Sequence, residues 1–183
     1  GREHNTPIVM IVSSPALAKL SEKLGAAAVI VEAKEAGGHL GTDKPLREIF
    51  APIRDVIKKI PLIAAGGITN GYEMAEMMDE YGADGVQIAS RFVPSEECNI
   101  ADEFKQAYLN ARKEDIVLTS SPVGMPGRAI NNPFVQALNA GEDVSTKKCP
   151  QVCLKKMRSS LLHQRAPDDG LHRQYSGWFD FLR

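Results

Sequence analysis

Cysteine is scarce in this sequence: the 183 residues include only Cys98, Cys149 and Cys153. Three cysteines are too few for a disulfide framework, and an odd number favours a reducing, cytoplasmic setting. No apolar run approaches the roughly 20 residues needed to cross a bilayer. The first residues, GREHNTP, also lack the apolar stretch of a signal peptide. We therefore expect a cytoplasmic protein that does not enter a membrane.

An excess of charge of either sign is missing as well, because the formal net charge is −1 at pH 7. Such a balance leaves no basic surface for nucleic acid or for an anionic membrane. Hydrophobic residues make up 43% and charged residues 25%, both ordinary for a globular protein. The length suffices for one domain with a core. We expect a small-molecule ligand and no nucleic-acid or membrane partner.

Apolar runs alternate with helical periodicity over the first two-thirds of the chain, which predicts four consecutive strand–helix units. The predicted strands are residues 7–14, 26–32, 61–67 and 84–90. The first strand, PIVMIVSS, is apolar enough to be buried on both faces. This alternation predicts an α/β fold with a parallel sheet, either an open doubly wound sheet or part of a (β/α)8 barrel. A spacing of roughly 20–30 residues favours the barrel, of which four strands are half.

Local signals mark where the predicted helices begin and end. Ser14 and Pro15 are expected as the N-cap and first residue of the first helix, and Gly25 is placed to end it. Either Thr69 or Asn70 is expected to cap the third helix.

The interiors of two predicted helices carry further expectations. Pro52 is expected to divide the second helix into two pieces. The methionines of the third helix are interpreted as core packing: Met74, Met77 and Met78.

Two stretches are typical of a phosphate site. In AAGGITNG, Gly66 and Gly67 end a strand and precede a helix start, where close backbone approach and unpaired N–H groups attract anions. In GVQIASRF, the next strand ends at Ala89 and Ser90. Successive parallel strands end side by side, at the place where barrels commonly hold a phosphate. The alternative is a tight turn and a helix cap without a ligand.

A histidine, His39, follows the second predicted strand in EAGGHLG and therefore belongs to the same sheet edge. An imidazole can exchange a proton at physiological pH, and the surrounding glycines leave room for substrate or cofactor. The alternative is a solvent-exposed loop histidine. Glu32 and Glu35 either orient the imidazole or lie on a solvated loop face.

Other candidate ligands are less specific. Arg91 and Arg128 are candidates for pairing with an anion. Cys149 and Cys153 lack two further ligands at a spacing that zinc requires, so we expect no metal site.

Four motifs in this order, EAGGHLG, IAAGGITNG, GADGVQIASRF and SPVGMPGRAI, resemble the nitronate monooxygenase family. That family includes the closely related flavin-dependent enoyl-acyl-carrier-protein reductases. The resemblance covers residues 7–153, and CPQVC is similar to a cysteine-bearing stretch of one bacterial branch. It implies a (β/α)8 barrel that binds FMN non-covalently, of which this chain resembles strands five to eight and the segment after them.

The resemblance also implies roles for single residues. By position, His39 matches the active-site base. The residues that match cofactor contacts, near the flavin or in the two phosphate turns, are Gly37, Gly38, Gly66, Gly67, Gln87, Ile88, Ala89 and Ser90. The family usually has Gly-Thr where this chain has Ala89–Ser90, so the hydroxyl is kept and a methyl group is added.

We expect the chain to consist of three segments. Residues 1–113 are expected to form the C-terminal half of a flavin-binding barrel. Residues 114–153 are expected to form a loop-rich segment over the substrate side, with neither helix nor strand in TSSPVGMPGRAINNPF. Residues 154–183 form an atypical tail that is either disordered or frame-shifted. Because the family's opening strands are absent, our hypothesis is a fragmentary gene product.

The resemblance implies an FMN-dependent oxidoreductase that oxidises alkyl nitronates with dioxygen. One alternative is an FMN- and NAD(P)H-dependent enoyl-acyl-carrier-protein reductase of fatty-acid synthesis. Others are a phosphate-binding barrel enzyme without flavin, and an inactive truncated half-barrel that pairs with another chain through its open edges. NADH and NADPH are not distinguished, and a homodimer is one of the oligomeric states left open.

Overall fold

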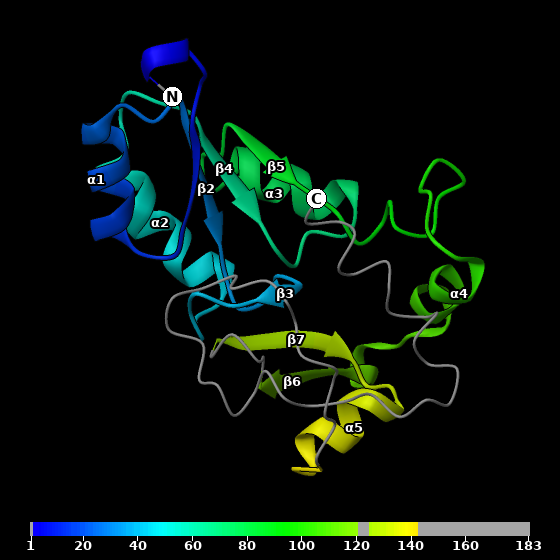
Figure 1. Ribbon diagram of the computed structural model, residues 1–183. Coiled ribbons are helices and arrows are strands. Elements are labelled where there is room, and N and C mark those ends of the chain that lie inside the picture. The colour runs from blue at the N-terminus through cyan, green and yellow to red at the C-terminus, as the bar shows by residue number, and fades with distance from the viewer. Residues whose placement is uncertain (1, 121–124, 143–183) are drawn as a thin grey trace. The chain divides into compact units, whose positions relative to one another are not determined.

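The computed structural model describes residues 2–120 and 125–142, and the chain divides into two units between Ala89 and Ser90 (Figure 1). The elements of the first unit are η1 (Arg2–His4), β1 (Val9–Val12), α1 (Pro15–Leu24), β2 (Ala28–Glu32), β3 (Gly38–His39), α2 (Leu46–Val56), β4 (Leu62–Ala65), α3 (Gly71–Asp79) and β5 (Gly85–Gln87). Those of the second are α4 (Asp102–Asn110), η2 (Lys113–Asp115), β6 (Ile116–Ser120), β7 (Pro126–Ile130) and α5 (Pro133–Asn139).

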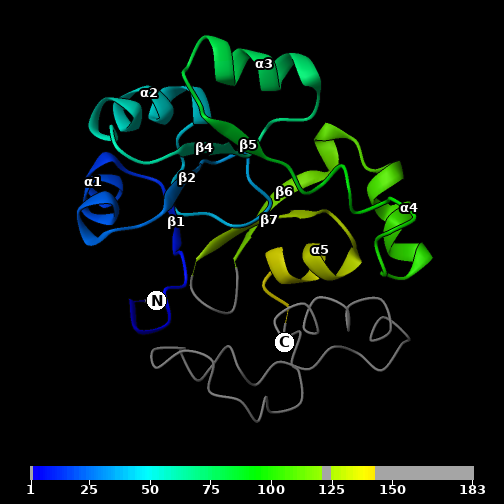
Figure 2. The same cartoon turned by 90° about the horizontal axis from the view of Figure 1, so that it is seen from above.

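The first unit is built on a parallel sheet with the strand order β1-β2-β4-β5. Each strand lies next to the one that precedes it in this sheet, and α1, α2 and α3 lie on the same side of the strands (Figure 2). A doubly wound sheet would reverse its strand order and carry helices on both faces, so this arrangement is that of a barrel. The predicted α/β fold, a partial (β/α)8 barrel, is confirmed.

The local signals for helix ends are confirmed in α1. The Leu17 N–H donates a hydrogen bond to Ser14 Oγ at 3.4 Å, and Pro15 is the first helical residue. Gly25 ends the helix with a φ of 88°, a left-handed conformation that glycine adopts without strain.

Pro52 does not divide α2, contrary to the sequence prediction, because the helix runs from Leu46 to Val56 without interruption. The missing N–H of a proline leaves one helical carbonyl without its donor. Pro52 is exposed, so water can take the place of that donor.

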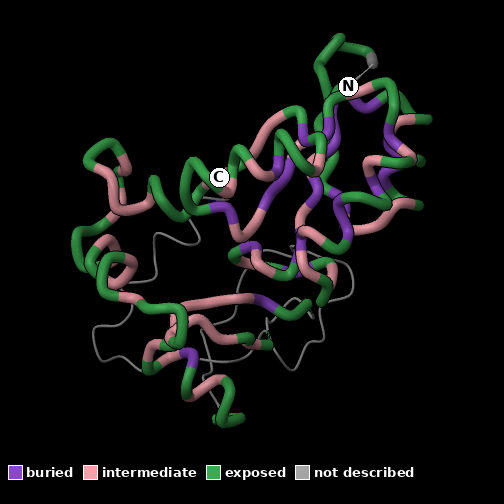
Figure 3. The backbone as a smooth tube through the Cα atoms, turned by 180° about the vertical axis from the view of Figure 1, so that it is seen from behind, coloured by how far each residue is buried: buried purple, intermediate pink, exposed green. Residues whose placement is uncertain are grey.

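The core of the first unit lies between the sheet and the helices, and Figure 3 shows buried residues concentrated in the part that contains the N-terminus. The largest fully buried side chains are Phe50, Leu46, Ile53, Ile57, Leu62, Met77, Val12, Val29 and Val31. Met77 is core as predicted, but Met74 and Met78 are exposed. On so short a helix, only the row that faces the sheet becomes buried.

The first strand is not buried on both faces as the sequence predicted. Val9, Met10 and Ile11 are 48%, 37% and 53% exposed, and Val12 alone is buried. Within the described residues β1 is an edge strand that pairs with β2. A continuous apolar run indicates burial only where further layers cover the strand, and it does not distinguish an edge strand from a central one.

The second unit corrects the prediction of a segment without helix or strand over residues 119–134. There β6 pairs antiparallel with β7, with Leu118 beside Arg128. Pro126 is the first residue of β7, a position where a strand tolerates proline. The Val135 N–H donates to Asn132 Oδ1 at 2.9 Å, so the residues interpreted as loop-forming cap α5 instead.

Asp84 connects the start of β4 to α2. Its Oδ2 accepts hydrogen bonds from the Leu62 N–H at 2.8 Å and from Arg54 Nη1 at 2.9 Å. These bonds, the Leu62 N–H first, hold the pKa of the Asp84 carboxyl below its usual value. A carboxyl whose pKa is lowered by folding adds stability above its unfolded-state pKa, and this is lost as pH falls through the folded-state pKa.

We therefore expect Asp84→Asn to lower the free energy of unfolding by about 1 kcal/mol at neutral pH. Because folding lowers the pKa of this carboxyl from its usual value of 3.8, the difference from the wild type should shrink below pH 3.8 and disappear once the pH passes below the folded-state pKa. Chemical denaturation across this pH range measures it. Asp55→Asn, an exposed α2 residue, is the control and should change nothing. An Asp84→Asn difference that persists at low pH would contradict the assignment.

Candidate functional site

The carboxyl ends of the parallel strands bring the predicted site residues of the first unit to one edge. Gln87, the last residue of β5, lies beside Ala65, the last residue of β4. The turn Gly66–Gly67 and the residues Ile88–Ala89 therefore leave the sheet next to each other. Glu32, the last residue of β2, lies on the other side of Ala65. The adjacency of the two turns that the sequence predicts is present in the structure.

Glycine is required at both positions of the first turn. Gly66 has a φ of 96° and Gly67 a φ of 70°, conformations that other residues rarely adopt. A Cβ on Gly66 would lie 2.8 Å from the Ala36 backbone nitrogen, and one on Gly67 would lie 2.9 Å from Glu35 Cβ. The missing side chains thus make room for the neighbouring chain segment, and a ligand can meet this turn only from its other side.

Residues 35–41, called here the 35–41 segment, cross this edge and contain β3 with the exposed His39. At one end, the segment packs on Gly66–Gly67. At the other end, Ser13 Oγ, just after β1, donates a hydrogen bond to the Gly41 carbonyl at 3.2 Å. The segment thus reaches from the end of β4 to the end of β1. Sequence reasoning missed Ser13, although a hydroxyl after a strand at the functional edge was a usable signal.

The two glycines before His39 border open space. A Cβ on Gly37 or Gly38 would meet no atom within 4 Å. Gly38 has a φ of 81°, a backbone conformation that favours glycine. At Gly37 neither backbone strain nor crowding requires glycine. The backbone at these two positions is therefore not covered by other side chains among the described residues.

The two acidic residues near His39 differ in their surroundings. Glu32 is half-buried, and burial raises the pKa of its carboxyl. Glu35 Oε2 accepts a hydrogen bond from the Leu46 N–H at 3.0 Å, at the first residue of α2. The N-cap residue of α2, Pro45, supplies no side-chain hydrogen bond. Glu35 therefore has a role that neither sequence alternative named: it caps a helix from the loop.

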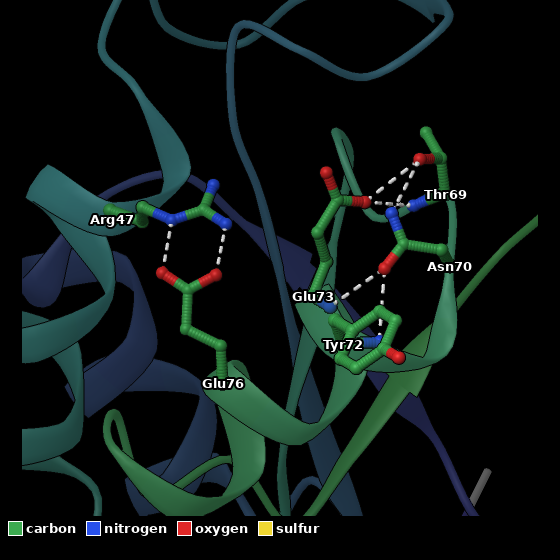
Figure 4. Close-up of polar contacts among 6 residues, drawn as sticks. All are labelled: Arg47, Thr69, Asn70, Tyr72, Glu73 and Glu76. Atoms are coloured by element: carbon green, nitrogen blue, oxygen red, sulfur yellow. Dashed lines mark hydrogen bonds and ion pairs between the residues drawn. The ribbon is translucent and has the colours of Figure 1, made fainter.

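The start of α3 corrects one part of the anion-site prediction (Figure 4). Asn70 is the cap, and its Oδ1 accepts from the Tyr72 N–H at 2.9 Å and the Glu73 N–H at 3.0 Å. Glu73 Oε2 accepts from the Thr69 N–H at 2.6 Å. Bonds to the Thr69 backbone and hydroxyl keep the pKa of Glu73 below its usual value, so the carboxylate is charged.

An anion at the start of α3 would therefore meet engaged amides and a negative charge. The predicted turns Gly66–Gly67 and Ile88–Ala89 lie outside these cap interactions. Arg47 and Glu76, also drawn in Figure 4, form a bidentate ion pair between α2 and α3 that fixes these helices.

Three further predicted residues belong to the second unit. Ser90 and Arg91 are exposed residues of the second unit, and Arg128 is half-buried in β7. Cys149 and Cys153 lie outside the described residues. Across residues 2–120 and 125–142, no three His, Cys, Asp or Glu side chains are grouped to hold a metal, and every helix is too short or too polar to span a bilayer.

Comparison with known proteins relates this chain to one family. The nitronate monooxygenase family model matches residues 2–177. A probable nitronate monooxygenase of Staphylococcus aureus (strain JH9) is 32% identical over 150 residues, which are 77% of this chain and 42% of that protein. One from Staphylococcus saprophyticus is 27% identical over 178 residues, 92% of this chain and 49% of that protein. The chain thus spans less than half the length of these curated relatives.

Two solved structures also resemble this chain. FabK from Thermotoga maritima is 36% identical with a TM-score of 0.68, over 74% of this chain and 42% of that chain. Nitroalkane oxidase from Streptomyces ansochromogenes is 29% identical with a TM-score of 0.65, over 77% of this chain and 43% of that chain.

Proposed function

We propose that this chain, which belongs to the nitronate monooxygenase family, forms the part of an FMN-dependent oxidoreductase that holds the flavin phosphate and carries the catalytic base. The whole enzyme would oxidise alkyl nitronates with dioxygen. One observation carries the proposal: two adjacent strand-end turns and the His39 segment meet at a single sheet edge. Small-molecule sites of barrels are built from this edge.

The residues of this edge fit FMN in a specific way. The backbone of Gly66–Gly67 and of Ile88–Ala89 would hold the phosphate, since the start of α3 is occupied by its own caps. Gly37 and Gly38 would let the ring system approach, because no atom fills the space beside them. When bound, FMN supplies the two-electron redox chemistry, and the protein supplies position and electrostatics. The predicted contact from Ser90 stays a prediction.

His39 has the chemistry of a general base. A nitroalkane carries an acidic proton on the carbon next to its nitro group, and an imidazole nitrogen can accept it to give the nitronate. Because His39 is exposed, the imidazolium can return its proton to water. Glycines flanking the histidine leave the imidazole accessible to substrate.

A second candidate is NAD(P)H-dependent reduction of an enoyl thioester on the same flavin. The similarity to FabK, at 36% identity against 29% for nitroalkane oxidase, supports this second candidate function. His39 would then donate a proton to the substrate carbon instead of removing one.

Titration with two flavins tests the cofactor site. FMN should bind to the 183-residue chain at least about 10-fold more tightly than riboflavin, because hydrogen bonds to a charged phosphate contribute about 1.5–3 kcal/mol each. Quenching of flavin fluorescence measures both dissociation constants. Riboflavin, which lacks the phosphate, is the matched control, and equal affinities would exclude a phosphate site.

Turnover then separates the two candidates. Oxygen consumption with propyl-2-nitronate is expected under the first, and NAD(P)H oxidation that depends on an enoyl thioester under the second. If the flavin-loaded chain shows neither activity, both candidate functions are excluded for this chain.

A further inference from the structure

We infer that Glu35 is a positioning residue that fixes His39 relative to the turn Gly66–Gly67, called here the glycine turn. Its side chain contacts both this turn and the start of α2. The inference rests on the proposed function for the role of His39. Its structural part, that Glu35 fixes the 35–41 segment, stands on the contacts alone.

The first contact is at the start of α2. That helix begins after Pro45, which makes no side-chain cap, and the Leu46 N–H donates instead to Glu35 Oε2 at 3.0 Å. A carboxylate is a favourable acceptor there, because the N-terminal end of a helix carries partial positive charge. The Glu35 carboxylate is thereby tied to a helix that buries Ile49, Phe50 and Ile53 in the core.

The second contact is with the glycine turn. A Cβ on Gly67 would lie 2.9 Å from Glu35 Cβ and 3.1 Å from its Cγ, so the stem of Glu35 lies against the bare backbone of the turn. The next residue, Ala36, lies equally close to Gly66. Glu35 is therefore clamped between the start of α2 and the proposed phosphate turn.

These contacts matter because the chain around His39 is intrinsically flexible. Gly37, Gly38 and Gly41 surround it, and glycine restricts the backbone least of all residues. β3, which contains His39, is itself a strand of a hydrogen-bonded sheet, and the ends of the segment add two further fixed points: Glu35 at one end and the Ser13–Gly41 hydrogen bond at the other. A displacement of about 1 Å of a reacting group costs about 10²-fold in rate.

The test compares Glu35→Ala with Glu35→Gln. Alanine removes the acceptor and most of the stem, so kcat should fall about 10²-fold while KM stays within about 2-fold. Glutamine keeps an oxygen acceptor and the full stem, and should restore kcat to within about 3-fold of the wild type. Glu48→Ala is the matched control, because this exposed carboxylate also lies in the first turn of α2 but pairs only with Lys44 among the described residues.

A second readout needs neither flavin nor activity. Hydrogen–deuterium exchange of residues 35–41 in the flavin-free chain should rise at least about 10-fold in Glu35→Ala and stay near wild type in Glu35→Gln and Glu48→Ala. If Glu35→Ala does not fold, Glu35→Asp takes its place, since its shorter stem withdraws the carboxylate from Leu46. Unchanged exchange in both Glu35→Ala and Glu35→Asp would overturn the inference.

The two kinds of failure are distinguishable. A wild-type chain that neither binds FMN nor turns over substrate would refute the proposed function, while the exchange experiment would still decide whether Glu35 fixes the segment. A Glu35→Gln variant that is as impaired in kcat as Glu35→Ala, with wild-type exchange, would show that Glu35 does not act by positioning.

Discussion

Replacing His39 with alanine is expected to lower kcat for a neutral nitroalkane by about 10²–10⁴-fold, the contribution typical of a general base. The same variant should oxidise the corresponding nitronate far better, because that anion has already lost the proton that the imidazole would remove. Affinity for FMN should change little, because the phosphate contacts we propose lie in the turns after β4 and β5. Oxygen consumption with both forms of one substrate measures the effect.

His4→Ala is the matched control for this experiment. His4 is an exposed histidine of η1, distant in the chain from the strand ends, and its loss should leave both activities unchanged. A His39→Ala variant that retains nitroalkane oxidation would remove this residue from the mechanism. An equal loss with the nitronate would assign it to binding instead of proton transfer.

Gly66→Ala is expected to abolish FMN binding and to lower the free energy of unfolding by about 2–4 kcal/mol. Two costs add up: a side chain at a φ of 96°, and a methyl group 2.8 Å from the Ala36 nitrogen and 3.1 Å from its Cα. These neighbours are backbone atoms, so they cannot rotate away as a flexible side chain could. Chemical denaturation and flavin titration measure the two effects.

Gly71→Ala provides the comparison. Gly71 is the first residue of α3, a Cβ there would meet nothing within 4 Å, and its φ is ordinary. Alanine is therefore expected to leave flavin affinity unchanged and to raise stability slightly, by about 0.5 kcal/mol. If Gly66→Ala behaved like Gly71→Ala, the turn would not have the close approach described here.

Where the physical cause of a structure is local, the sequence was sufficient to predict it. Ser14 begins α1 and Gly25 ends it because a hydroxyl acceptor and a left-handed backbone are properties of those residues themselves. Asn70 caps α3 for the same reason. The order of strands and helices followed from alternating periodicities, which left an open sheet and a barrel as alternatives, and the spacing of the units favoured the barrel.

Predictions failed where the outcome depends on what covers a residue. The apolar run of β1 lies at a sheet edge, and Val9 to Ile11 are exposed there. Pro52 remains inside α2 because its side of the helix meets water. Pro133 and Asn132 were interpreted as loop residues, although both are equally at home at a helix start.

The sequence predicted which residues lie at this sheet edge, but not the contacts that hold them there. Sequence motifs brought His39 and Gly66–Gly67 to one edge through strand order alone. The contacts that hold the 35–41 segment, Glu35 to Leu46 and Ser13 to Gly41, link residues 11 and 28 positions apart. Such pairings leave no local pattern, because the residues involved are also common in ordinary loops and caps.

Anchorage at both ends has a consequence for how this region can vary among related sequences. The separation between the ends of β4 and β1 is a property of the sheet, so the number of residues bridging it is constrained. An insertion or deletion between Glu35 and Gly41 would have to be absorbed by Gly37 and Gly38. We therefore expect related sequences to differ in the side chains of the 35–41 segment and to conserve its length.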